Sequence, residues 1–142
     1  LSFLNQIAKK NNLSFLIKPH PLISEFTDDL KKEFKNLQFT NKKINYALKN
    51  VFATISFSST VIEDSLYSNI PVILLDRWKR YKHCEAEENV KKKNSAIYYV
   101  NNGNDLIDCI STIRKSYKIS FDKYIFAGRA KNNINNLFNK LL

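Results

Sequence analysis

The chain has 142 residues, enough for about one domain, and 44% of them are hydrophobic. Apolar residues recur in regular blocks, which excludes a disordered segment, and no apolar run approaches the roughly 18 residues that a membrane-spanning helix needs. The net charge of +10 favours anionic partners: nucleic acid, phosphorylated ligands, anionic polymers or a lipid surface.

The start of the chain and its cysteines bear on where the protein works. The sequence contains no methionine, so we expect Leu1 to be an internal position of a longer protein. Residues 1–10 lack the basic and apolar regions of a signal peptide. Two cysteines, Cys84 and Cys109, do not make a disulfide framework, so we expect reduced thiols in a cytoplasmic protein.

Helical and strand-like segments alternate along the chain. Apolar residues at helical spacing predict the helices, and short apolar or β-branched runs predict the strands. Residues 76–93 are polar and charged, and their structure stays unassigned. The expected elements are helices over 1–10, 22–34, 44–49, 60–68, 105–117 and 121–142, and strands over 13–17, 37–40, 51–57, 71–75 and 96–100.

This alternation predicts an α/β fold: a Rossmann-like three-layer α/β/α domain over residues 1–142, with a parallel sheet covered by helices on both faces. Strands without polar alternation agree with a sheet that is buried on both faces. In such folds ligands bind beyond the carboxyl ends of the strands. The residues just after Ile17, Phe57, Leu75 and Val100 are therefore the candidates for a site.

A Lys-Pro-His-Pro motif at 18–21 directly follows the first predicted strand. The two prolines restrict the backbone, so they hold Lys18 and His20 at the edge of the sheet. A rigid imidazole there could donate to a phosphate oxygen or transfer a proton, and Lys18 adds positive charge. A purely structural interpretation is equally open: the motif is a turn that ends the strand, and the ring only satisfies a backbone carbonyl.

A second motif lies between the strand ending at Phe57 and the next helix. Ser58, Ser59 and Thr60 place three hydroxyls there, where free backbone N–H groups favour an anion. Glu63, one turn further, could accept from two vicinal ribose hydroxyls. The structural alternative is that Thr60 and Glu63 form a capping box, which needs no ligand. The loop lacks glycine, so it is not a dinucleotide fingerprint.

The two motifs are about 40 residues apart and should reach the same edge of the predicted sheet. His20 and Lys18 would then approach a diphosphate from one side, and the hydroxyl loop would hold it from the other. Our hypothesis of a binding site depends on this convergence.

These motifs, with Asn-Ile-Pro-Val-Ile at 69–73, resemble the C-terminal domain of bacterial capsular-polysaccharide and related surface-glycan transferases of the GT-B fold. Polysialyltransferases and CDP-glycerol glycerophosphotransferases share this layout. The resemblance covers residues 13–76. Where the family usually has glycine, this chain has Asn69, which tolerates the same left-handed backbone.

The resemblance implies a role for each motif. His20 would lie at the donor phosphate and assist departure of the nucleotide, Ser58 and Ser59 would bind that phosphate with Thr60 beside them, and Glu63 would bind the ribose. The chain would be half of a GT-B enzyme, and the acceptor domain with its catalytic base would precede Leu1. The partners would be a nucleotide-sugar donor and a glycan acceptor, with peripheral contact to the inner membrane left open.

Two other functions stay open at this point. A nucleotide-sugar 2-epimerase has a similar two-domain fold, but its phosphate loop normally contains glycine and paired acids. A nucleic-acid-binding module would explain the charge and the aromatic-basic stretch Trp78–Lys82, yet the lysines are scattered, so nucleic acid is the less favoured partner.

We expect neither a metal nor a cofactor. The sequence has no Asp-x-Asp motif, and the cluster from His83 to Glu88 lacks metal-ligand spacing, so a charged loop is the expected structure there.

Overall fold

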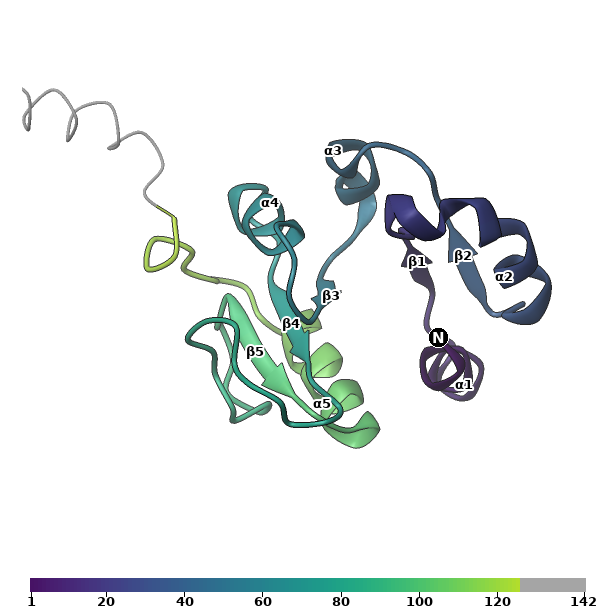
Figure 1. The fold of residues 1–142 in the computed structure, drawn as a ribbon. Coiled ribbons are helices and arrows are strands. Elements are labelled where there is room, and N and C mark those ends of the chain that lie inside the picture. The colour runs from purple at the N-terminus through teal and green to yellow at the C-terminus, as the bar shows by residue number, and fades with distance from the viewer. Residues whose placement is uncertain (126–142) are drawn as a thin grey trace, which may run out of the picture. The chain divides into compact units, whose positions relative to one another are not determined.

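The computed structural model describes residues 1–125, in which helices and strands follow one another in the predicted order up to Arg114. Its elements are α1 (Ser2–Asn11), β1 (Phe15–Ile17), η1 (Pro21–Phe26), α2 (Thr27–Glu33), β2 (Leu37–Phe39), α3 (Ile44–Ala47), η2 (Leu48–Asn50), β3 (Thr54–Ser56), α4 (Val61–Tyr67), β4 (Val72–Leu75), β5 (Ile97–Val100) and α5 (Gly103–Arg114), where η marks a 3₁₀ helix (Figure 1).

The chain divides into two compact units, Leu1–Asn50 and Val51–Leu142. Each unit has its own sheet: β1 pairs with β2, and β3, β4 and β5 pair in that order. Each of these pairings is parallel, so the predicted α/β class with parallel strands, consistent with a Rossmann-like α/β/α domain, is confirmed. The sequence also predicts that residues 1–142 form one donor-binding domain. This depends on how the two units assemble, and it stays a prediction.

In the first unit, β1 and β2 pair with Phe15 opposite Leu37 and Ile17 opposite Phe39. Both α1 and α2 contact β2, and α1 buries Ile7 and Ala8 on the predicted apolar face. The strand β1 is less buried than its apolar sequence predicts, because Leu16 is 40% exposed.

The segment predicted as one helix over 22–34 is instead a 3₁₀ helix followed by α2. A 3₁₀ helix has three residues per turn, so residues four apart no longer share a face. Accordingly, Leu22 and Phe26, which the helical spacing assigned to the buried face, are 80% and 53% exposed. The prediction of a continuous amphipathic helix there was wrong.

The second unit is built around the central strand β4, where Val72, Ile73 and Leu74 are almost completely buried. Val72 and Leu74 pack in one cluster with Ile62 and Leu66 of α4. Since successive side chains of a strand point to opposite faces, Ile73 faces the other side of the sheet. The helix α5 contacts β4 and β5, and Figure 1 shows it across the sheet from α4. This unit therefore has the predicted three layers.

The segment that the sequence left unassigned returns along the outer edge of β5. The Glu87 amide donates to Ile97 O and the Tyr99 amide donates to Glu87 O, both at 2.9 Å, in a parallel bridge. This bridge covers part of an edge that would otherwise present unpaired backbone groups.

At the C-terminal side, most of the helix expected over 121–142 lies outside the described residues. Its first part, residues 121–125, is a turn in which the amides of Tyr124 and Ile125 donate to Phe121 O. Over residues 1–125, each helix is too short or too polar to cross a membrane.

Candidate functional site

His20 lies in the turn that leaves β1, between Pro19, which is buried, and the 3₁₀ helix η1. Both Lys18 and His20 are exposed. The Leu22 amide donates to His20 Nδ1 at 3.3 Å. The ring thus has the backbone contact that a structural interpretation requires, although it accepts rather than donates. A neutral ring whose Nδ1 accepts carries its proton on Nε2, so the turn also presents a defined N–H donor.

The three hydroxyls after β3 are all exposed. Ser59 Oγ accepts from the Val61 amide at 3.3 Å, and Thr60, the residue before α4, makes no side-chain cap hydrogen bond. The capping box of Thr60 and Glu63, which was the structural alternative, therefore does not form. Its physical reason is the helical backbone of Thr60 (φ −59°, ψ −15°), whereas a capping residue normally has an extended one.

Glu63 lies exposed in the first turn of α4. Cys84 packs against the cluster that contains Ile62 and Leu66 of the same helix. Burial first and the Glu63 charge second raise the pKa of the Cys84 thiol. Cys84 and Cys109 are both free, as predicted. The end of the segment that follows β4 therefore packs against the same cluster as α4.

The segment Asp76–Cys84, here the post-β4 loop, contacts the hydroxyl loop directly. His83 Nδ1 lies 3.3 Å from Ser58 Oγ. The rings of Tyr81 and Phe57 meet edge to face with centroids 5.1 Å apart, and the Arg80 guanidinium carbon lies 3.9 Å from the Phe57 ring centroid. These contacts place a histidine and an arginine beside the predicted phosphate-binding hydroxyls.

Asp76 anchors the post-β4 loop. Its side chain is completely buried, and Oδ2 accepts from the Tyr99 hydroxyl at 3.1 Å and from the Tyr81 amide at 3.2 Å. Burial alone would raise the pKa of Asp76, but these hydrogen bonds outweigh burial and hold the pKa below its ordinary value of 3.8. Oδ1 lacks a hydrogen-bond partner among the described residues and faces Arg80 Nε at 3.6 Å.

Sequence reasoning placed Arg80 in the aromatic-basic stretch Trp78–Lys82 and His83 in a cluster without metal-ligand spacing, but it predicted neither of them beside the hydroxyl loop, and it did not single out Asp76. The rule that ligands bind beyond strand ends pointed to the position after Leu75, but it could not show where the following loop folds. The contact between Ser58 and His83 joins residues 25 positions apart. Local periodicity carries no information about such a contact.

The predicted site residues fall in both units. Lys18 and His20 belong to the first, whereas Ser58, Ser59, Thr60 and Glu63 belong to the second. The second unit holds its four residues together after the carboxyl end of β3, where Ser58 contacts His83 of the post-β4 loop. The strands that the two motifs follow, β1 and β3, belong to two different sheets, whereas the sequence predicted one sheet. The convergence of His20 with Ser58 on one phosphate concerns both units and stays a prediction.

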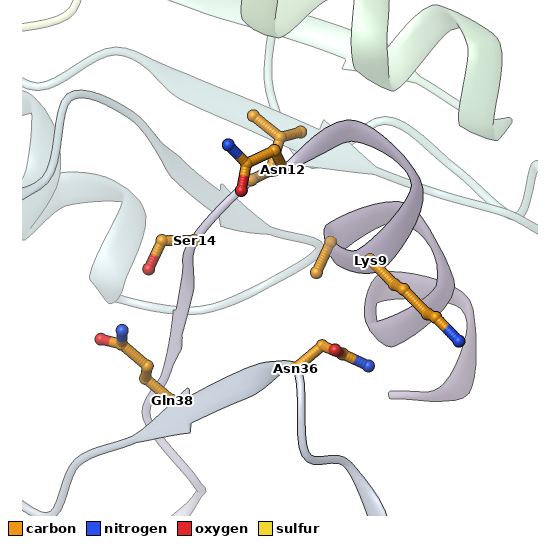
Figure 2. A pocket seen from close by; sticks show the side chains of 7 residues that line it. Lys9, Asn12, Ser14, Asn36 and Gln38 are labelled. Atoms are coloured by element: carbon orange, nitrogen blue, oxygen red, sulfur yellow. The ribbon is translucent and has the colours of Figure 1, made fainter.

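A pocket in the first unit does not coincide with any predicted site residue. It has a volume of about 340 Å³, and Figure 2 shows polar side chains around it. Ser14 and Asn36 directly precede β1 and β2, so the pocket lies at the amino ends of these strands, whereas His20 follows a carboxyl end. The lining residues are Ala8, Lys9, Asn12, Leu13, Ser14, Asn36 and Gln38.

The acidic residues after His83 form ion pairs with lysines, as expected for a charged loop. Glu85 pairs with Lys123 and Glu87 pairs with Lys92, each at 2.6 Å, and Glu88 pairs with Lys82. In the part of the chain that the structure describes, no three histidine, cysteine, aspartate or glutamate side chains gather as metal ligands.

Comparison with known proteins relates nearly the whole chain to one part of a larger protein. The chain is 30% identical over 149 aligned positions to the minor teichoic acid biosynthesis protein GgaB of Bacillus subtilis (strain 168). The alignment takes in 98% of this chain but 16% of that protein. No family profile matches the chain, and no solved structure is significantly similar to it. At a coarse level, the similarity agrees with the resemblance to surface-glycan transferases.

Proposed function

We propose that this chain is the donor-binding part of a bacterial glycosyltransferase that moves a sugar or a polyol phosphate from a nucleotide-activated donor to a surface glycan. The observation that carries the proposal is the exposed hydroxyl loop at the carboxyl end of β3, in a chain similar along 98% of its length to part of a teichoic acid biosynthesis protein. Carboxyl ends of parallel strands are where α/β folds bind ligands.

The hydroxyl loop is suited to the donor phosphate. Ser59 Oγ accepts from a backbone amide, which leaves its own O–H free to donate to an oxyanion. The hydroxyls of Ser58 and Thr60 are exposed beside it. As the bond to the nucleotide breaks, charge develops on the departing phosphate, and donors that are already in place stabilise it without reorganisation.

His20 acts on the same phosphate in this proposal. Its Nδ1 accepts from the Leu22 amide, so Nε2 carries the proton and can donate to the leaving phosphate oxygen. Lys18 adds a positive charge two residues away, which favours a diphosphate over an uncharged ligand.

Glu63 completes the donor contacts. An exposed carboxylate one turn into α4 can accept hydrogen bonds from both vicinal hydroxyls of a ribose. The acceptor would bind to another part of the protein, which would also provide the base that activates it. No metal or cofactor takes part, and the activated donor implies work in the cytoplasm, with contact to the inner membrane when the acceptor is membrane-bound.

The first test concerns His20 in the full-length protein. His20→Ala should lower donor turnover by about 10²–10⁴-fold, because it removes the proton donor at the leaving phosphate. His20→Asn is the matched variant: its amide oxygen can still accept from the Leu22 amide, so it should keep the turn and its melting temperature while losing most activity. Unchanged turnover in both variants would refute the role of His20.

The second test concerns Glu63 and the ribose. The full chain would be titrated with CDP and UDP and with their 2′-deoxy forms. The parent chain should prefer the ribose form by about tenfold, consistent with loss of a charge-assisted hydrogen bond. Glu63→Ala should abolish this preference, and Asp64→Ala, at the adjacent exposed acid, should keep it.

The full-length protein incubated with a UDP-sugar alone tests the chemistry. If an epimer of the sugar appears without any acceptor, the protein catalyses epimerisation and not transfer. Transfer that requires an acceptor supports the proposal.

A further inference from the structure

The pair formed by Ser58 and His83 keeps a hydrogen-bond donor for an anion in either tautomer. If the Ser58 hydroxyl donates to Nδ1, the ring proton is on Nε2 and is available. If Nδ1–H donates instead, the Ser58 hydroxyl can donate elsewhere. Both side chains are exposed, so a ligand can reach them.

Arg80 is held in place on two sides. Its guanidinium lies over the Phe57 ring at 3.9 Å, and its Nε faces the buried Asp76 carboxylate at 3.6 Å. These contacts leave the two terminal nitrogens of the guanidinium fork for another acceptor, and the side chain is 50% exposed. A planar fork with restricted motion suits two oxygens of one phosphate.

The post-β4 loop carries a net positive charge, although one of its cations, Lys82, is paired with Glu88 outside the loop. Its nine residues contain four cationic side chains, and the one acidic side chain, Asp76, is completely buried. The contacts of Asp76 with Tyr99 and Tyr81 fix the start of this loop against β5. The cationic loop is therefore held against the sheet by Asp76, unlike a run of lysines that is surrounded by solvent.

We propose that Arg80 and His83 are further ligands of the donor, binding the phosphates of the nucleoside diphosphate together with Ser58. This inference rests on the proposed function, because it adds two residues to the same phosphate site. It assigns the post-β4 loop a role in donor binding.

Inorganic pyrophosphate is the probe, since it carries the proposed ligand group without a base or sugar. The full chain would be titrated with pyrophosphate, CDP and UDP by calorimetry. Arg80→Ala and His83→Ala should each weaken binding of pyrophosphate about tenfold or more, the range for a charge-assisted hydrogen bond. Because Ser58 and His83 act as a pair, Ser58→Ala combined with His83→Ala should cost less than the sum of the single changes.

Arg114→Ala is the matched control. Arg114 also lies over a phenylalanine ring, with its guanidinium carbon 4.9 Å from the Phe52 centroid, but Phe52 precedes β3 and so lies toward the opposite end of this strand. Its loss should leave pyrophosphate affinity unchanged. If Arg80→Ala unfolds the chain, the variants Arg80→Lys and His83→Gln are measured instead. Arg80→Lys keeps the charge but lacks the planar fork. Each of the two should weaken pyrophosphate binding severalfold.

The outcomes separate this inference from the proposed function. Binding that depends on Ser58 but is unaffected by the Arg80 and His83 changes would overturn the role of the post-β4 loop and leave the proposed function standing. A parent chain that binds neither pyrophosphate nor nucleotide would overturn both.

Discussion

Asp76 is a carboxylate placed where its charged form is favoured despite complete burial. Removing it from water disfavours the charge, but the Tyr99 hydroxyl and the Tyr81 amide donate to Oδ2, and Arg80 faces Oδ1. The carboxylate joins β4, β5 and the post-β4 loop at one point. A neutral side chain of the same size would fill the same volume but would be a weaker hydrogen-bond acceptor.

This arrangement predicts a pH dependence of stability. The folded-state pKa of Asp76 lies below its ordinary value of 3.8, so its contribution is complete well above pH 3.8 and is lost as the pH falls through the lower folded value. Asp76→Asn should therefore lower the melting temperature at pH 7, by about 5 °C. The difference from the parent chain should persist down to about pH 5 and shrink below pH 4.

Thermal denaturation followed by circular dichroism at several pH values measures this difference. Asp28→Asn is the matched control, because the pKa of Asp28 is also lowered, through the hydrogen bond from Lys31 at 2.8 Å, but both side chains are exposed. Exposed ion pairs contribute little, so that variant should change the melting temperature only slightly. A difference between the Asp76→Asn variant and the parent that does not vary with pH contradicts the role given to the carboxylate.

At the scale of elements, α4 connects the hydroxyl loop to the core. Ile62 and Leu66 pack on the sheet, and Ser65, which is completely buried, lies 2.8 Å from Thr54 Oγ1 and 2.6 Å from Val61 O. The Val61 carbonyl can only accept, so the Ser65 hydroxyl donates its one proton there and accepts from the Thr54 hydroxyl. The helix is thereby fixed to β3, and the loop between them is held at both ends.

The chain leaves α4 through a left-handed residue. Asn69 has φ +56°, as the sequence predicted for the position where the transferases that it resembles have glycine. Asn69→Ala should reduce the free energy of unfolding by about 1 kcal/mol, because a residue with Cβ is disfavoured there and alanine lacks the local hydrogen bonding of asparagine. Asn69→Gly should change it by less than about 0.5 kcal/mol or increase it.

Urea denaturation checks both Asn69 variants. Asn104→Ala, in the first turn of α5, replaces an exposed asparagine whose φ is not positive, and it should not destabilise the chain. Equal stability of the Ala and Gly variants at position 69 would contradict the backbone argument.

The starts of α4 and α5 show how far local sequence reasoning reaches. The Thr60–Glu63 pattern has the residues of a capping box but does not form one, because Thr60 has a helical backbone. At α5, the Asn102 side chain accepts from the Asp105 amide at 2.9 Å and forms a true cap. The same kind of pattern thus has different outcomes, because the backbone before each helix is set by the strand and loop that precede it.

For the whole molecule, the net charge of +10 leaves nucleic acid as an alternative partner. Several lysines are already paired: Lys82, Lys92 and Lys123 each form an ion pair with a glutamate. The remaining cations should bind single-stranded DNA weakly and nonspecifically, with an affinity that falls steeply with salt, by a logarithmic slope of about −0.7 per phosphate contact.

Titration of the full chain with single-stranded DNA and with CDP or UDP across salt concentrations compares the two partners. DNA binding should be indifferent to His20→Ala and Glu63→Ala, whereas nucleotide binding should weaken in both variants. DNA binding that stays tight at physiological salt, with no measurable nucleotide binding, would favour a nucleic-acid-binding module.

From the sequence alone, the order of elements, the parallel α/β class, the free thiols and the left-handed Asn69 could be predicted. The elements and the turn depend on near neighbours: apolar spacing within a helix, branched residues within a strand, or a turn that only certain residues tolerate. The free thiols follow from the low cysteine count. The two motifs could also be located, because the end of a strand is a local feature. Their chemistry stays a proposal.

The tertiary structure alone decided which side chains surround the hydroxyl loop. His83 reaches Ser58 across 25 positions, and Tyr99 reaches Asp76 across 23. Such contacts result from how a loop without periodicity packs against strands that are neighbours in the sheet but not in the chain. No local pattern encodes that packing, because its energy arises only when the distant segments meet.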